Sequence, residues 1–132
     1  MKLLLLTLLL LLPVTLHAGL DWKQTSKNHM WTKGETSLTT EFSYKNTGKT
    51  PVKIVAVKGG CACCTTAKAS KKVLAPGESG VIKVHMGFRG KTIPTTKAVM
   101  VKTDDEKTVN LLVAIQTPDG QPVEIPVVRF GK

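Results

Sequence analysis

The sequence predicts an all-β chain that folds as one antiparallel β-sandwich, and three observations support this prediction. Beyond the first 18 residues, the chain is rich in valine, isoleucine and threonine, which favour strands over helices. Several short stretches alternate apolar and polar residues with a period of two, and turn residues separate them. No stretch of this part has a helical period, and 132 residues provide enough chain for one such domain.

Residues 1–18 are typical of an export signal. Met1-Lys2 gives a short positive start, residues 3–12 are almost entirely apolar, and the small residue Ala18 precedes Gly19. This order of features is typical of a secretory signal peptide, and the apolar stretch is shorter than the roughly 20 residues of a membrane-spanning helix. We therefore predict cleavage after Ala18 and an exported mature chain, periplasmic or extracellular, without a transmembrane segment. An uncleaved membrane anchor is the alternative interpretation.

Three strands are expected in the first half of the mature chain. A short strand at 20–25 opens the domain. The clearest alternation covers 36–46, where leucine, phenylalanine and tyrosine share one face of a half-buried strand. Residues 46–51 then supply turn chemistry, because asparagine and glycine tolerate positive φ and proline cannot continue a ladder freely. A third strand is predicted at 52–58.

The second half is expected to form three more regular strands. Residues 61–72 are small and polar, so they predict an irregular crossing with a short edge strand. A proline- and glycine-containing turn at 74–80 follows. Alternating apolar residues then predict strands at 81–88, 95–103 and 108–116.

The tail at 117–132 differs from the rest of the chain. Pro118, Pro122 and Pro126 each remove a backbone donor, so residues 123–128 are suited only to an edge strand or an extended strap. Such a strap either docks on the sheet edge of a partner or covers an edge of its own domain. We favour the second interpretation.

Four motifs of the mature chain resemble those of one bacterial family. They are 41–54 with its Asn-Thr-Gly turn, Cys61-Ala62-Cys63, 74–80 with its Pro-Gly-Glu turn, and the strand at 97–105. The family is domain of unknown function 1573, an exported immunoglobulin-like β-sandwich, and the resemblance covers residues 36–116. It implies an immunoglobulin-like sandwich of about seven strands within residues 19–116. It implies no particular activity, because the family has no settled one.

Cys61, Cys63 and Cys64 form the one cluster with notable chemistry. The family motif is Cys-Gly-Cys-Thr, so here Ala62 replaces the glycine and Cys64 is an additional thiol. A Cys61–Cys64 disulfide or inert thiols are the favoured interpretation for an exported protein. The alternative is a copper or zinc site with these three thiolates as ligands. A catalytic redox pair is not expected, because no helix follows to lower the pKa of a thiol.

Other candidate metal ligands carry little weight. In the predicted strand 81–88, Met86 is expected to face the core and His85 the solvent, because neighbouring strand residues point to opposite faces. His29-Met30 lies in a stretch without a clear pattern. Residues 104–106 are acidic, but they lack the spaced oxygen ligands of a calcium loop, so they indicate a solvated hairpin tip.

Charge and motif content narrow the function. Basic residues outnumber acidic ones by 19 to 9, yet all except Arg89 and Arg129 are lysines spread along the strands, so no nucleic-acid partner is expected. The chain has no nucleophile elbow, phosphate loop or zinc-protease motif, so we expect no enzyme. We predict a non-enzymatic extracytoplasmic module that binds an envelope protein or serves a structural role there, with a sheet edge or loops as contact surface. A small copper- or zinc-binding protein that uses the cysteine cluster is the alternative.

Overall fold

The structure is a computed structural model that describes residues 19–59 and 65–127. These residues form strands and turns, and no helix among them is long and apolar enough to cross a membrane. The strands are β1 (Leu20–Trp22), β2 (Ser26–Met30), β3 (Ser37–Asn46), β4 (Val52–Gly59), β5 (Thr65–Ala69), β6 (Val73–Leu74), β7 (Ser79–Gly87), β8 (Thr92–Ile93), β9 (Thr95–Thr103), β10 (Thr108–Gln116) and β11 (Val123–Glu124).

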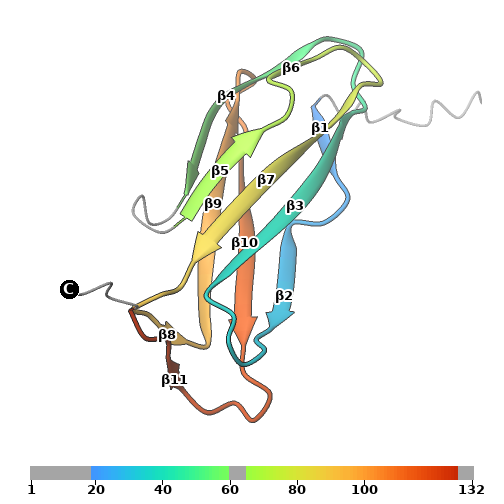
Figure 1. The fold of residues 1–132 in the computed structure, drawn as a ribbon. Helices are drawn as coiled ribbons and strands as arrows, with labels where there is room; N and C mark the ends of the chain where they lie inside the picture. Colours follow the sequence, from blue (N-terminus) through green and yellow to red (C-terminus); the bar gives the residue numbers. More distant parts are fainter. Residues whose placement is uncertain (1–18, 60–64, 128–132) are drawn as a thin grey trace, which may run out of the picture.

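Two sheets make up the sandwich, as the sequence predicts (Figure 1). One sheet has the order β1-β3-β7-β5 and the other the order β2-β10-β9-β4-β6. Every pair within them is antiparallel except β2 with β10, which is parallel. Figure 1 shows the reason: the chain keeps its direction as it passes from β1 in one sheet to β2 in the other.

The core lies between the sheets and is built by the alternation that the sequence shows. In the long strands, alternate residues point inward, and most of the outward ones are polar. On β7, Met86 is buried and His85 is exposed, which confirms the expected orientation of this pair. Burial of these apolar side chains provides the main stabilisation of the fold. The largest buried side chains are Phe42, Tyr44, Leu74, Ile82, Met86, Phe88, Ile93, Leu111 and Ile115.

The N-terminal part differs from the expected single strand at 20–25. β1 ends at Trp22, and a separate strand β2 follows at Ser26–Met30. The inward positions of β2 are the half-buried Lys27 and His29, so its sequence has no apolar alternation to reveal a strand. Pairing with β10, a long-range interaction, places these residues in the sheet.

The C-terminal tail packs on its own domain. Val123 in β11 pairs with Ile93 in β8, and Ile125 is buried in the core. The backbone N–H of Gly90 donates to the carbonyl of Ile125 at 2.7 Å, which fixes the tail beside the turn that precedes β8. The described part of the tail is therefore a strap that docks on its own domain.

Some sequence predictions lie outside the described residues. They are the signal peptide at 1–18, the cysteines Cys61, Cys63 and Cys64, and the end of the tail at 128–132. These stay predictions.

Candidate functional site

The two sheets differ in how their edges are covered on the side where β4 and β5 lie. Among the described residues, β5 is the edge strand of its sheet and pairs only with β7. β4 pairs with β9 along its length, but β6 covers its other edge only at Val52 and Lys53. The Ile54 N–H then donates to the carbonyl of Lys72 at 2.7 Å, and beyond this bond no strand of the described chain lies along the outer edge of β4.

A β-bulge shapes this edge of β4. The register between β4 and β9 shifts between Ile54 and Ala56, so Val55 is the additional residue. A bulge bends its strand and turns side chains away from the regular alternation. Val55 is 49% exposed because it takes the outward position after the buried Ile54, and beyond the bulge both Ala56 and Val57 are partly buried. The run of four apolar residues therefore leaves apolar surface at the edge of the sandwich.

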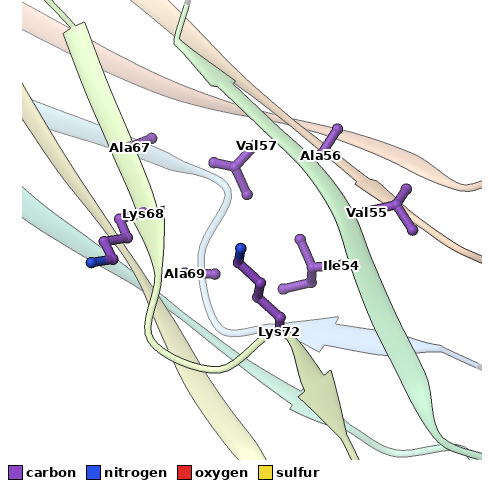
Figure 2. Close-up of a pocket in the computed structure, with 8 residues that line it drawn as sticks. All are labelled: Ile54, Val55, Ala56, Val57, Ala67, Lys68, Ala69 and Lys72. Carbon is purple, nitrogen blue, oxygen red and sulfur yellow. The ribbon is translucent and has the colours of Figure 1, made fainter.

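An open groove with a volume of ≈ 230 Å³ lies between β4 and β5. Figure 2 shows Val57 and Ile54 of β4 on one side and Ala69 of β5 on the other, with the Lys72 side chain reaching between them. Ile54 and Ala69 belong to the buried core, whereas Val57 is only partly buried. The groove therefore exposes part of the core at the side of the sandwich. Its lining residues are Ile54, Val55, Ala56, Val57, Ala67, Lys68, Ala69 and Lys72.

β4 and β5 come into close backbone contact at one end of the groove, where β4 ends and β5 begins. A Cβ atom on Gly59, at the end of β4, would lie 2.5 Å from the backbone oxygen of Thr65, at the start of β5. No real Cβ approaches a carbonyl oxygen this closely, so only glycine permits the contact. The lining residues of the groove come before Gly59 in β4, after Thr65 in β5, and at Lys72 in the turn that follows β5.

The charge around the groove has one sign. Among the described residues, Lys68 and Lys72 are its only charged lining residues, and neither forms an ion pair there. The neighbouring Lys71 differs, because it pairs with Glu78. The exposed Lys58 on β4 adds a further positive charge nearby without an ion pair among the described residues. The groove thus combines an apolar floor with a positive margin.

The candidate metal ligands do not come together in the described part of the structure. The Nε2 atom of His29 on β2 lies 3.0 Å from Oε2 of Glu35, whereas Nδ1 of His85 on β7 lies 2.9 Å from Oγ1 of Thr39. These two histidines belong to different sheets. Residues 19–59 and 65–127 contain no group of three or more histidine, cysteine, aspartate or glutamate side chains suited to a metal ion. The cysteine cluster lies outside these ranges, so the structure does not test it.

The acidic stretch after β9 forms a turn in which Asp105 is hydrogen-bonded to neighbouring residues of the same turn. Oδ1 of Asp105 accepts hydrogen bonds from the Thr103 hydroxyl and, at 3.3 Å, from the Lys107 N–H. The Thr103 bond lowers the pKa of Asp105 most, and although burial raises it, the Lys107 backbone bond and the Lys107 charge lower it further, so the pKa of Asp105 lies below its ordinary value. This arrangement is a hairpin tip, as the sequence indicates.

Sequence reasoning missed the groove as a site. The sequence feature that could have indicated the groove is the run from Ile54 to Val57, where four consecutive apolar residues interrupt the alternation of β4. Such a run in a half-buried strand indicates a bulge or an apolar edge. That β5 lies opposite depends on the pairing of β5 with β7, which has no local signature.

Solved structures show the same type of fold. A protein of unknown function from Porphyromonas gingivalis has a TM-score of 0.63 at 15% identity, with 74% of this chain and 46% of that chain covered. The Escherichia coli chaperone DraB has a TM-score of 0.50 at 11% identity, with 76% and 56% covered. The PapD-like domain 7 of human CEP192 has a TM-score of 0.51 at 11% identity, with 80% and 85% covered. At these identities the similarity shows the fold alone, an immunoglobulin-like sandwich of the PapD-like type.

The family assignment comes from the sequence comparison. No curated protein matches the chain. The family model for proteins of unknown function DUF1573 matches residues 20–116, from the first strand to the end of β10. This range includes all the motifs that suggested the resemblance and covers most of the chain. The chain therefore belongs to the DUF1573 family of proteins of unknown function.

Proposed function

We propose that this protein is a non-enzymatic binding module of the bacterial envelope, which holds a protein partner at the groove between β4 and β5. The observation that carries the proposal is the groove itself, where apolar residues reach the surface between the edge strand β5 and the part of β4 that β6 does not cover. Exposed strand edges are templates for pairing with another chain, and many binding domains use them in this way.

Two further observations support a binding role over catalysis. Val57 and Ala67 are only partly buried although they pack against the core, so a partner that covers them removes apolar surface from water. The similarity to a chaperone, DraB, agrees with a fold that binds other proteins. The extracytoplasmic location rests on the signal sequence predicted at residues 1–18.

Site-specific crosslinking in the exported protein tests this function. A photoreactive amino acid replaces Val55, which lines the groove, or Asn110, which is exposed on β10, a strand that does not line the groove. We expect the processed protein to begin at Gly19 outside the cytoplasm and to crosslink to one envelope protein from position 55 and not from position 110. An unprocessed cytoplasmic protein contradicts the location, and equal or absent crosslinks at the two positions contradict the site.

A further inference from the structure

Lys97 on β9 occupies a position on the core-facing side of its strand. The next two residues on the same face, Val99 and Val101, are fully buried, whereas Lys97 itself is half-buried. Across the sheet it pairs with the buried Val113 of β10. An ammonium group on this face needs water or an acceptor, because a buried charge without a partner is costly. The surroundings of the Lys97 side chain therefore decide what it can bind.

The Lys97 side chain lines a small cavity of ≈ 130 Å³ where the end of β7, β8 and the start of β9 come together (Figure 1). One wall is apolar, because Met86 and Phe88 are buried core residues. The remaining wall carries two ammonium groups and two hydroxyls. The volume equals the share of about four molecules of liquid water, at about 30 Å³ each, so the cavity suits a group of few heavy atoms. The lining residues are Met86, Gly87, Phe88, Lys91, Thr92, Thr95 and Lys97.

The polar side chains of this cavity have no partner within residues 19–59 and 65–127. Lys91 and Lys97 form no ion pair there, and the hydroxyls of Thr92 and Thr95 form no hydrogen bond there. Glu124 of β11 pairs with Thr92 in the ladder, but it does not line the cavity and forms no ion pair with a described residue. The described lining of the cavity is therefore positive, and its hydrogen-bond donors are available to a ligand.

The backbone that carries Lys91 is held on both sides. Its N–H donates to the carbonyl of Phe88 at 3.1 Å, and its carbonyl accepts from the Ile125 N–H at 2.9 Å. Ile125 is buried in the core, so the strap fixes this turn to the domain. The two lysines thus enter the cavity from two held elements, the turn before β8 and the strand β9. A ligand consequently needs to order only their side chains.

From this arrangement we infer that the cavity is a binding site for a phosphate group. Two ammonium groups match the charge of a phosphate monoester near neutral pH, and lysines and hydroxyls donate to its oxygens. A carboxylate has one charge and leaves the second ammonium group without compensation. The cavity is partly open to solvent, so it admits free phosphate or the phosphate end of a larger molecule. It shares no lining residue with the groove, so the inference does not rest on the proposed function.

Titration of the isotope-labelled exported protein, followed by NMR, tests the site. The probes are inorganic phosphate and glycerol 3-phosphate, with acetate for comparison, all at constant ionic strength. We expect both phosphates to cause saturable shifts of the amides of Thr92, Thr95 and Lys97, and acetate to bind at least about tenfold more weakly. The phosphate that binds more tightly identifies the source of the group, a free anion or an ester.

Two lysines of β9 provide matched variants. Lys97→Gln removes the inward charge and is expected to weaken phosphate binding about tenfold. Lys102→Gln removes the same charge from an exposed position of the same strand and is expected to keep the affinity within about twofold. Lys91→Gln changes the second ammonium group of the cavity, on the turn instead of the strand, and is expected to resemble Lys97→Gln. Retained dispersion of the amide spectrum shows that each variant is folded.

Three results would overturn the inference. Equal weakening by Lys97→Gln and Lys102→Gln would show that phosphate responds only to the net charge of the protein. Acetate binding as tight as phosphate binding would show that the cavity does not select phosphate. Shifts that do not saturate, or that spread over lysines outside the cavity, would show that no defined site exists. None of these results changes the crosslinking expected at position 55, so the proposed function is tested separately.

Discussion

Asn46 is a single buried residue that connects three parts of the sandwich. Its side-chain amide donates to the carbonyls of Thr50 at 2.8 Å and Leu74 at 3.0 Å, and its Oδ1 accepts from the Gly48 N–H at 3.0 Å. The residue is fully buried at the end of β3, and its bond to the buried Leu74 joins two groups that have no water as a substitute.

Asn46→Ala is therefore expected to lower the free energy of unfolding by about 1–3 kcal/mol, because it leaves the buried Leu74 carbonyl without this donor. Urea unfolding measures this change. Asn110→Ala, an exposed change on β10, serves as the control and is expected to stay within about 0.5 kcal/mol of the parent. Equal effects of the two variants would show that the buried amide makes no special contribution.

Gly80 is a second single residue that matters for stability, because there is no room for a side chain at this position. A Cβ atom there would lie 2.6 Å from the Tyr44 hydroxyl oxygen and 2.7 Å from the ring carbon that carries it. Tyr44 is buried, and its hydroxyl donates to the Lys71 carbonyl at 2.7 Å, so a shift of the ring would disturb both its packing and this bond. We expect Gly80→Ala to destabilise the domain by about 1–3 kcal/mol in thermal or urea unfolding. The neighbouring exposed change Ser79→Ala is the control, and a parent-like Gly80→Ala variant would contradict this packing.

At the scale of elements, the turn between β2 and β3 is fixed by one carboxylate. Oε2 of Glu35 accepts from the Thr32 N–H at 2.9 Å and lies 3.0 Å from Nε2 of His29. The backbone bond from Thr32, followed by the hydrogen bond to His29, holds the pKa of Glu35 below its ordinary value of 4.5. A depressed carboxyl pKa stabilises the folded state above the unfolded-state pKa, and this contribution disappears as the pH falls through the folded-state pKa.

Glu35→Gln is accordingly expected to lower stability at neutral pH, with a difference from the parent that is constant above about pH 5.5 and shrinks below about pH 4.5. Unfolding midpoints measured across this pH range check the prediction. Glu41→Gln is the control, because Glu41 is exposed and its nearest ion-pair contact, from Oε1 to Nζ of Lys83, is long at 4.0 Å. A Glu35→Gln difference that does not change with pH would contradict the role of the carboxylate in the turn.

The segment between β4 and β5 contains all three cysteines of the chain. The sequence leaves a local disulfide, inert thiols and a copper or zinc site as interpretations. A bridge from Cys61 to Cys64 closes a very small loop, so it constrains the unfolded chain less than the roughly 3 kcal/mol expected for a 15-residue loop. The core of the described part is built from aliphatic, aromatic and methionine side chains of both sheets and includes no cysteine.

We therefore expect replacement of all three cysteines by serine to leave a cooperatively folded β domain with modestly lower stability. Circular dichroism and urea unfolding check this. Loss of the fold would show that the cysteines are structural. Elemental analysis of the parent, purified under reducing conditions, tests the metal interpretation: about one equivalent of copper or zinc that is absent from the serine variant would establish it.

For the whole molecule, the sequence predicts the fold well wherever burial alternates along one strand. The strands β3, β4, β7, β9 and β10 all lie where the period of two places them. β2 was missed because Lys27 and His29 occupy its inward positions, and only the parallel pairing with β10 makes it a strand. The groove was missed for the same reason, because it forms between two strands of different sheets that become neighbours only in the folded chain.

The exposed apolar residues of the whole molecule provide the most direct test of the central claim, that the groove is the contact site. Val55, Leu112 and Val127 are 49%, 40% and 59% exposed, and they lie at the groove, on β10 and in the tail. Each position is replaced in turn by the same photoreactive amino acid in the exported protein, and the yield of crosslinks to envelope proteins is compared. The account predicts that position 55 gives the highest yield of the three. Higher yields at position 112 or 127, with none at position 55, would contradict the account.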